Sequence, residues 1–321
     1  MLWLPILFMA GEFIIKSHEI TDFSYGRYPG ARPIEDLLIN GLVIMDKWPG
    51  VTSRFVVEHV RKTLHIKKAG HSGTLDPKVT GVLPIALGNS CKAMSALQNL
   101  DKKYVGTMTL HSDVDERLVS AAVRKFIGKI RQKPPVRSAV RRVQRTRTIH
   151  NFEIMEQQGR KVMFSVHCEA GTYIRKLVHD MGKALGTAAH MDDLRRVQVG
   201  RFKEQHAVKM DDLLDAYAQW KKSGSEVIRE CVLPVEAAVE HVKKLIIKDS
   251  AVAQVANGAP LYTSGLSRIE KNISKGDAVA VLTLKGELVA LGTAGMAGSD
   301  MAKRRGTAAR PSRIVIDRKA Y

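Results

Sequence analysis

The sequence predicts an α+β protein in which a large mixed-sheet domain is followed by a small C-terminal β-barrel or sandwich. Three observations lead to this prediction. Apolar residues recur at helical spacing in some segments and alternate as in half-buried strands in others, and both patterns occur before residue 240. Beyond that point, short β-rich runs are separated by glycine-containing turns. A chain of 321 residues is long enough for two such domains.

The larger domain is expected to begin near Ile34 with a buried strand and a helix. Residues 41–47 read GLVIMDK, an apolar run typical of a buried strand. The turn PGVTS follows, and either Thr52 or Ser53 is expected to cap a helix. The apolar face of that helix repeats every four residues at Val56, Val60 and Leu64. Residues 70–88 follow the helix and are expected to form a loop.

Two strands and a second helix are expected further along the chain. Residues 103–114 and 161–168 alternate as half-buried strands do. In the second strand, one side is formed by Val162, Phe164, Val166 and Cys168. A helix is expected where apolar residues return at helical spacing, at Ile174, Leu177, Val178, Met181 and Leu185.

The domain boundaries predicted from these patterns divide the chain into three parts. Residues 1–33 are expected to form an N-terminal arm that packs near the C-terminal domain, residues 34–238 the mixed-sheet domain, and residues 239–321 the β-rich domain with a basic tail. The β-rich runs of the last part lie at residues 243–248, 277–284 and 287–292.

Net charge indicates a polyanionic partner, with nucleic acid as the first candidate. Lys and Arg number 51 against 32 Asp and Glu, which gives a net charge of +19 and a pI of about 9.9. Between Arg117 and Arg147 there are eleven basic residues and no acidic one. Because Val119, Val123, Phe126, Ile127 and Ile130 punctuate this run, it is expected to be a folded surface rather than a disordered arm.

Cysteine usage and hydropathy favour a protein of the reducing cytoplasm without a membrane anchor. Cys91, Cys168 and Cys231 are far apart and form no CxxC pair, which argues against a disulfide framework or a zinc site. The first eleven residues are apolar, but they are too short to span a bilayer and lack the basic start of a signal peptide.

One glycine-rich segment, residues 70–88, reads GHSGTLDPKVTGVLPIALG and carries a single aspartate, Asp76, directly before Pro77. Asp-Pro is a common turn pair, so the local pattern alone favours a turn. Glycines also let the backbone approach a ligand, and a carboxylate presented in this way can act as a nucleophile or a base. The segment therefore fits both a turn and a catalytic loop.

A carboxylate in a cleft that excludes water needs a cation nearby, because desolvation raises its pKa. Arg175, at the start of the second predicted helix, is a candidate, since arginine can grip a carboxylate with two donors. An ordinary surface arginine is the alternative. Tyr104 and Tyr173 carry rings of the kind on which unpaired bases stack. His71 by itself is typical of a loop histidine bonded to the backbone.

Asp76, His71, Tyr173 and Arg175 lie in motifs that resemble the pseudouridine synthase family containing bacterial TruB and dyskerin. The resemblance is closest to archaeal dyskerin homologues, the catalytic subunits of H/ACA guide-RNA particles. The catalytic-loop motif matches residues 70–88, the first motif DKWPGVTS, and the later motifs CEAGTYIRKLVHDMGKALGTAAHMDDLRR. The segment from VKKLIIKDS to LKGELVALGTA resembles a PUA domain. Trp48 stands where the first motif usually has proline.

The resemblance implies an isomerase that converts uridine in RNA to pseudouridine: the glycosidic bond breaks, uracil turns, and carbon 5 bonds to the sugar. It also implies that Asp76 is the essential aspartate and that Arg175 is its ion-pair partner. The residues implied to contact or enclose the flipped base are His71, Tyr104, Tyr173 and Leu194. No metal or other cofactor is implied. Covalent attack and proton abstraction by Asp76 both remain open.

The implied partners are RNA and the core proteins of the H/ACA particle. The RNAs are tRNA, rRNA and an H/ACA guide RNA; the proteins are a small scaffold subunit, a glycine-arginine-rich-type subunit and a kink-turn-binding ribosomal-type protein. Three other functions compete: a stand-alone tRNA pseudouridine synthase, a catalytically silent guide-RNA scaffold, and a basic RNA-binding protein that acts through phosphate contacts alone. The complete set of Asp76, Tyr104, Tyr173 and Arg175 favours an enzyme.

Overall fold

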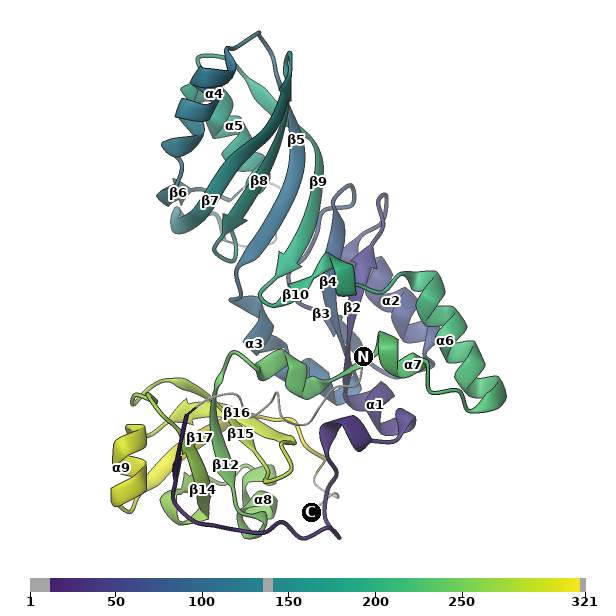
Figure 1. The fold of residues 1–321 in the computed structure, drawn as a ribbon, viewed down its shortest axis with the longest axis vertical. Helices are drawn as coiled ribbons and strands as arrows, with labels where there is room; N and C mark the ends of the chain where they lie inside the picture. The colour runs from purple at the N-terminus through teal and green to yellow at the C-terminus, as the bar shows by residue number, and fades with distance from the viewer. Residues whose placement is uncertain (1–11, 135–140, 318–321) are drawn as a thin grey trace.

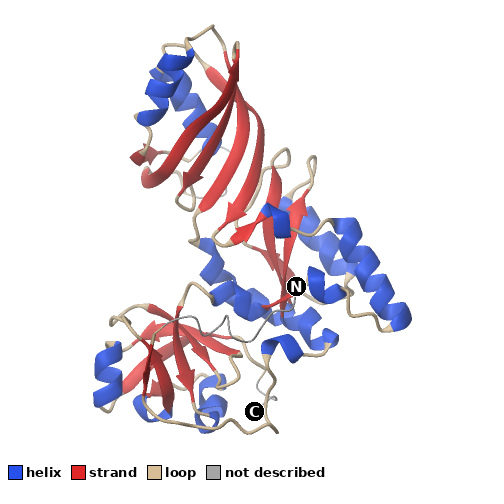
Figure 2. Cartoon of the chain, in the orientation of Figure 1, coloured by secondary structure: helices blue, strands red, loops and turns tan. Residues whose placement is uncertain are grey.

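The structure, a computed structural model, describes residues 12–134 and 141–317. The chain forms an elongated molecule in which one large sheet runs through the upper and middle parts and a second, curled sheet forms the lower part (Figures 1 and 2). The apolar segment 1–11 and residues 135–140 of the basic run lie outside the described residues. The predicted α+β class, with a mixed sheet followed by a C-terminal β-rich part, is confirmed.

The large sheet is mixed, and its strands run in the order β11-β2-β4-β9-β5-β8-β7-β6, with β3 beside β4 and β10 beside β9. All these strand pairs are antiparallel except β4 and β9, which meet in parallel at Thr80–Arg195 and Gly81–Arg196. The strands are β2 (Gly41–Lys47), β3 (Ala69–His71), β4 (Thr80–Leu87), β5 (Lys102–Leu110), β6 (Gly128–Gln132), β7 (Arg145–Gln158), β8 (Lys161–Cys168), β9 (Ala189–Val199), β10 (Phe202–Lys203) and β11 (Leu233–Pro234).

Helices cover the large sheet in two groups. Near the upper end, α4 packs on β7 and α5 on β9, whereas lower down α2 packs on β3 and β4 and α6 packs on α2 (Figure 1). One apolar cluster lies beneath both groups. The helices are α1 (Ile34–Asn40), α2 (Ser53–Thr63), α3 (Met94–Gln98), α4 (Glu116–Arg124), α5 (Ile174–Ala184), α6 (Met210–Ser223) and α7 (Ile228–Cys231).

Most elements predicted from periodicity are confirmed. The strands expected at 41–47 and 161–168 are β2 and β8, and the helix expected to begin at Ile174 is α5. Thr52, not Ser53, caps α2, because its hydroxyl accepts a hydrogen bond from the backbone N–H of Phe55 at 3.1 Å. In the basic run, Val119 and Val123 are buried in α4, although Ile127 is exposed.

The prediction that all of residues 70–88 form a loop is wrong. Residues 69–71 form β3, and residues 80–87 form β4, a buried strand between β2 and β9. Only the segment in between, with Asp76 near its centre, is loop. Glycine and proline suggested a loop throughout, but the apolar sequence TGVLPIAL buries seven of its eight residues, and this burial outweighs the low strand propensity of Pro84.

The C-terminal part is a curled sheet with strand order β1-β14-β12-β15-β16-β17-β13, flanked by α8 and α9. The β-rich runs expected at 243–248, 277–284 and 287–292 are β12, β15 and β16. The elements are β12 (Lys243–Ile247), α8 (Asp249–Ala256), β13 (Leu261–Tyr262), β14 (Leu266–Glu270), β15 (Ala278–Leu282), β16 (Leu288–Ala294), α9 (Gly298–Lys303) and β17 (Thr307–Ile314).

A single apolar cluster runs from the large sheet into the curled sheet. It joins Leu42 and Val82 of the large sheet to Ala280, Leu282 and Leu288 of the curled one. Interfaces between independent domains are usually more polar than this. The division at residue 239 therefore stays a prediction, because the two parts share a core at that point.

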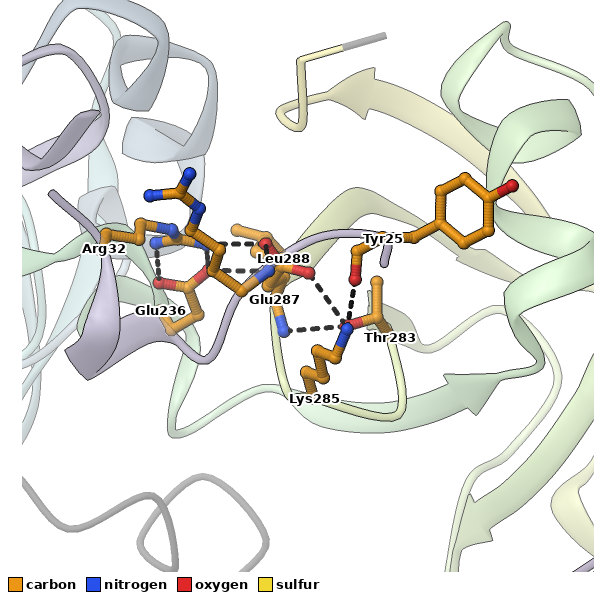
Figure 3. A network of polar contacts seen from close by, with 8 residues as sticks. Tyr25, Arg32, Glu236, Thr283, Lys285, Glu287 and Leu288 are labelled. Atoms are coloured by element: carbon orange, nitrogen blue, oxygen red, sulfur yellow. Dashed lines mark hydrogen bonds and ion pairs between the residues drawn. The ribbon is translucent and has the colours of Figure 1, made fainter. Parts of the chain in front are cut away.

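The N-terminal arm fastens the two parts together from outside. Its strand β1 (Phe13–Ile15) pairs with β14 at the edge of the curled sheet, and the arm then crosses to α1 (Figure 1). On the way, Lys285 donates to the backbone carbonyls of Asp22 and Tyr25, and Arg32 reaches the buried Glu236 (Figure 3).

No helix among the described residues is long and apolar enough to cross a membrane.

Candidate active site

A pocket of about 490 Å³ opens where the 72–79 loop, the first turn of α5 and strands β5 and β9 meet. Five of the six residues expected from the sequence line it: Asp76, Tyr104, Tyr173, Arg175 and Leu194. They come from four separate segments of the chain. The fold therefore brings together residues that the sequence analysis grouped by motif alone.

Asp76 and Arg175 form an ion pair at the mouth of this pocket. The distance between Nη2 of Arg175 and Oδ2 of Asp76 is 2.9 Å, and about half of each side chain is exposed to solvent. Arg175 lies in the first turn of α5, whose apolar face packs into the core, so its side chain is free to turn toward the loop. A carboxylate held in this way is paired with a cation and remains accessible to a ligand.

The loop that carries Asp76 is held by the last residue of β2, Lys47, and the first residue of α2, Ser53. The Ser53 hydroxyl accepts from the backbone N–H of Leu75 at 2.9 Å and donates to the Leu75 carbonyl at 3.1 Å. The buried amine of Lys47 donates to the carbonyls of Trp48, Pro77 and Val79 at 2.8 to 3.0 Å. Burial lowers the pKa of Lys47, and Asp76 opposes that shift.

Strands β5 and β9 supply the wall of the pocket. Tyr104 lies opposite Arg196, and Gly106 lies opposite Leu194. A side chain at position 106 would have no room, because its Cβ would lie 2.8 Å from Cδ1 of Leu194. Burial raises the pKa of the Tyr104 phenol, and the Arg196 guanidinium opposes this shift. The wall thus combines an aromatic ring and an aliphatic side chain.

Tyr173, directly before α5, is fixed through its backbone. The side-chain amide of buried Gln132 accepts from the N–H of Tyr173 at 3.0 Å and donates to its carbonyl at 3.2 Å. This two-way contact ties the start of α5, and with it Arg175, to strand β6. No sequence motif pointed to Gln132.

His71 is the one expected site residue that does not line the pocket. It lies at the end of β3, half-buried, and its Nδ1 has no hydrogen-bond partner among the described residues. Burial lowers the pKa of His71, and the positive charge of Arg196 lowers it further. The substrate-binding role of His71 therefore stays a prediction.

Two pocket cations were not anticipated. The amine of Lys102 donates to the carbonyls of Gln98 and Leu100 at 2.9 and 2.5 Å, and burial, reinforced by the charge of Arg196, lowers the pKa of Lys102 to about 8. Arg196 is fully enclosed at the back of the pocket. A signal was present in the sequence, since alternation in a strand puts Lys102 on the same face as Tyr104 and Arg196 on the same face as Leu194.

Within residues 12–134 and 141–317, no group of three or more His, Cys, Asp and Glu side chains has the arrangement of a metal site.

Three family models match successive parts of the chain. Residues 61–174 match the TruB family pseudouridylate synthase N-terminal domain, residues 175–240 the tRNA pseudouridylate synthase B C-terminal domain, and residues 243–316 the PUA domain. Asp76, Tyr104 and Tyr173 fall in the first match, and Arg175 and Leu194 in the second.

Relatives and solved structures match the chain almost from end to end. A protein of Archaeoglobus fulgidus named "probable tRNA pseudouridine synthase B" is 46% identical over 97% of this chain and 96% of its own length. A protein of the same name from Methanococcus maripaludis is 47% identical over 97% and 94%.

Two solved structures superpose closely. One, of an H/ACA RNP bound to a substrate RNA containing 2′-deoxyuridine, has a TM-score of 0.90 and 42% identity and covers 99% of this chain and 98% of that one. The other, of the archaeal box H/ACA sRNP Nop10-Cbf5 complex, has a TM-score of 0.89 and 44% identity and covers 97% and 98%. With these identities over nearly its whole length, the chain belongs to the TruB/dyskerin family of pseudouridine synthases, which are isomerases.

Proposed function

We propose that this enzyme converts uridine to pseudouridine at guide-directed sites in rRNA and at uridine 55 in the T-loop of tRNA, with Asp76 as the essential group. The observation that carries the proposal is the Asp76–Arg175 ion pair at the mouth of a pocket lined by Tyr104 and Leu194. No second carboxylate lines this pocket among the described residues. The chemistry on the sugar therefore falls to Asp76.

Each part of the pocket fits one step of the isomerisation. A base has to leave its stack to enter an enclosed site, and aromatic and aliphatic walls such as Tyr104 and Leu194 receive it. Asp76 then attacks the sugar or removes one of its protons while the bond from the base nitrogen to the sugar breaks. Carbon 5 of the turned base then bonds to the sugar as Asp76 leaves the sugar or returns its proton. Carbon 5 loses a proton and the freed base nitrogen gains one, so the reaction is redox-neutral.

Guide-directed modification is supported by the solved relatives. One of them is an H/ACA RNP with substrate RNA bound, and others are complexes with Nop10 and with Nop10 and Gar1, each matched over at least 97% of this chain. We infer that this chain takes a guide RNA and similar small core proteins as partners. Action on tRNA is supported by the names of the archaeal relatives.

The test incubates the purified protein with tRNA and, separately, with guide RNA, core proteins and a matching target RNA, and then maps pseudouridine. The expected result is product in both reactions, reduced to background by Asp76→Asn. A matched control is Asp113→Asn, because Asp113 also pairs with an arginine, Arg160, but does so at an exposed site outside the pocket. Full activity of Asp76→Asn would contradict the mechanism.

Arg175→Gln gives a second, independent arm of this test. Because the variant removes the cation that pairs with the Asp76 carboxylate and orients it, turnover should fall to near background. Guide-RNA affinity should stay within about twofold, since a single exposed contact contributes little to a large polyelectrolyte interface. Loss of turnover and of guide binding together would instead indicate a folding defect, which a melting curve would reveal.

A further inference from the structure

Arg196 is a buried cation in the pocket for which the proposed mechanism has no role. Its side chain is 1% exposed, although it belongs to the lining of the pocket. Among the described residues, no carboxylate oxygen lies within salt-bridge distance of its guanidinium. Burying an arginine without a counter-charge is costly, and such a residue is usually retained for what it holds.

The guanidinium holds two parts of the site at once. Nε donates to the carbonyl of Val82 at 2.8 Å, which anchors the side chain to β4. Nη2 donates to the carbonyl of Gly73 at 2.9 Å, at the start of the loop that presents Asp76. Tyr104 lies directly opposite Arg196 in the β5–β9 pair, and the charge of the guanidinium opposes the rise in pKa that burial causes in the Tyr104 phenol.

Gly73 and Gly81 make this arrangement possible. A Cβ on Gly73 would lie 3.2 Å from Nη1 of Arg196, and a Cβ on Gly81 would lie 2.3 Å from the Arg196 carbonyl oxygen. Both glycines have positive φ, which L-residues rarely adopt. The backbone on either side of the loop is therefore shaped around this one arginine.

We propose that Arg196 is a positioning residue of the reaction: it fixes the Tyr104 hydroxyl and the Gly73 end of the loop in one frame, so that the tyrosine ring and the Asp76 carboxylate face the same nucleotide. This inference rests on the proposed function, since it assumes that Asp76 and Tyr104 act on one uridine. It requires arginine in particular, because a planar fork directs several donors at fixed angles and a lysine ammonium cannot bridge the same acceptors.

A purely structural role of Arg196 predicts different effects of its variants. If Arg196 only filled space, its variants would lose stability, RNA affinity and turnover together. If it positions the site, Arg196→Lys keeps the charge and most of the stem but frees Tyr104 and the loop. A misplacement of about 1 Å in a reacting group is enough to lower a rate about a hundredfold.

The experiment compares Arg196→Lys, Tyr104→Phe and the double variant with the unmodified protein, using single-turnover pseudouridine formation, RNA dissociation constants and melting curves. Arg196→Lys should slow turnover about 10- to 100-fold while the dissociation constant changes less than about threefold. The double variant should be little slower than the slower single variant, because both substitutions break the same contact.

Arg195→Lys is the matched control. Arg195 precedes Arg196 in β9 but bonds Asp46 and Glu204 instead and does not line the pocket. Its turnover should stay within about twofold of the unmodified protein, since partly exposed ion pairs contribute little.

Three outcomes would overturn the inference: full-rate turnover of Arg196→Lys, rate losses that multiply in the double variant, or a loss of RNA affinity as large as the loss of rate. If Arg196→Lys does not fold, Tyr104→Phe decides alone, because the inference requires it to slow turnover. If the protein makes pseudouridine, loses activity with Asp76→Asn and keeps full activity with Arg196→Lys, only this inference is wrong. Activity in Asp76→Asn defeats the proposed function.

Discussion

Arg32 and Glu236 form a two-pronged ion pair between the N-terminal arm and the segment that precedes the curled sheet (Figure 3). Nη1 of Arg32 lies 2.8 Å from Oε2 of Glu236, and Nη2 lies 2.7 Å from Oε1. Oε1 also accepts from the backbone N–H of Leu288 at 2.9 Å, so Glu236 is bonded to the arm and to β16 at once. The Glu236 side chain is fully buried.

Because the pair is buried, removing one partner should lower the free energy of unfolding substantially. Arg32→Met leaves the Glu236 carboxylate buried without its cation, and the free energy of unfolding should fall by about 3–5 kcal/mol. Adding Glu236→Gln should recover part of the loss, since the amide is neutral and its oxygen still accepts from Leu288. Urea unfolding of both variants measures this. A double variant as unstable as Arg32→Met would contradict the account.

Thr52 and Ser53 are neighbours with different contacts, so their alanine variants should differ in turnover and in stability. Ser53→Ala removes both bonds to Leu75, so it should lower the free energy of unfolding by about 1–3 kcal/mol and also slow turnover through the loop. Thr52→Ala removes only the cap of α2, so it should cost about 1 kcal/mol and leave turnover unchanged. Chemical unfolding and single-turnover assays test the pair. Equal turnover in both variants would argue against the Ser53 contact as a catalytic support.

Gly81 and Gly50 provide a test of the close approach between β4 and β9. Both have positive φ, so alanine at either position carries a backbone cost of about 1–2 kcal/mol. At Gly50 that is the whole effect, because no atom lies within 4 Å of the added Cβ. At Gly81 the Cβ would also overlap the backbone of Arg196. Gly81→Ala should therefore melt well below Gly50→Ala, and similar melting temperatures would refute the close contact.

Lys102 should make stability depend on alkaline pH. Its pKa is lowered to about 8 in the folded protein, against an ordinary value of 10.5, so between these values the unfolded chain binds more protons. The contribution of this group to the free energy of unfolding therefore rises from pH 8 to pH 10.5. The free energy of unfolding of the unmodified protein minus that of Lys102→Met, measured by urea unfolding at several pH values, should increase from pH 8 to pH 10.5. A constant difference would show that the amine is not desolvated.

The sequence was sufficient for the elements whose pattern is set by burial on one side. Strand β8 and helix α5 begin at the expected residues, since alternation and helical spacing report directly on which side faces the core. Asp76 and Arg175 were found through their motifs, and the structure places them in contact. In β4 the same reasoning failed, because Gly81 and Pro84 within the strand concealed its burial.

The residues that hold the catalytic loop and pocket in place could not be predicted in the same way. Ser53 and Lys47 act on the loop through backbone carbonyls, and a backbone acceptor leaves no mark on the sequence. Arg196 acts across two strands, and its partner on the other strand depends on a register that shifts within the β5–β9 pair. The shared core of the two sheets was missed for a related reason, since apolar residues do not reveal which other element they contact.

The pairing of β1 with β14 sets a constraint on the order in which this protein can fold. Strand β1 is synthesised long before its partner β14, since the hydrogen bond from Ser267 to the Ser17 carbonyl joins residues 250 positions apart. The arm has no place to pair until the curled sheet is nearly synthesised. Contacts of such long sequence separation form late, because loop closure has to be completed first. The pairing of β1 with β14 is therefore expected to be one of the last steps of folding, although β1 is synthesised well before β14.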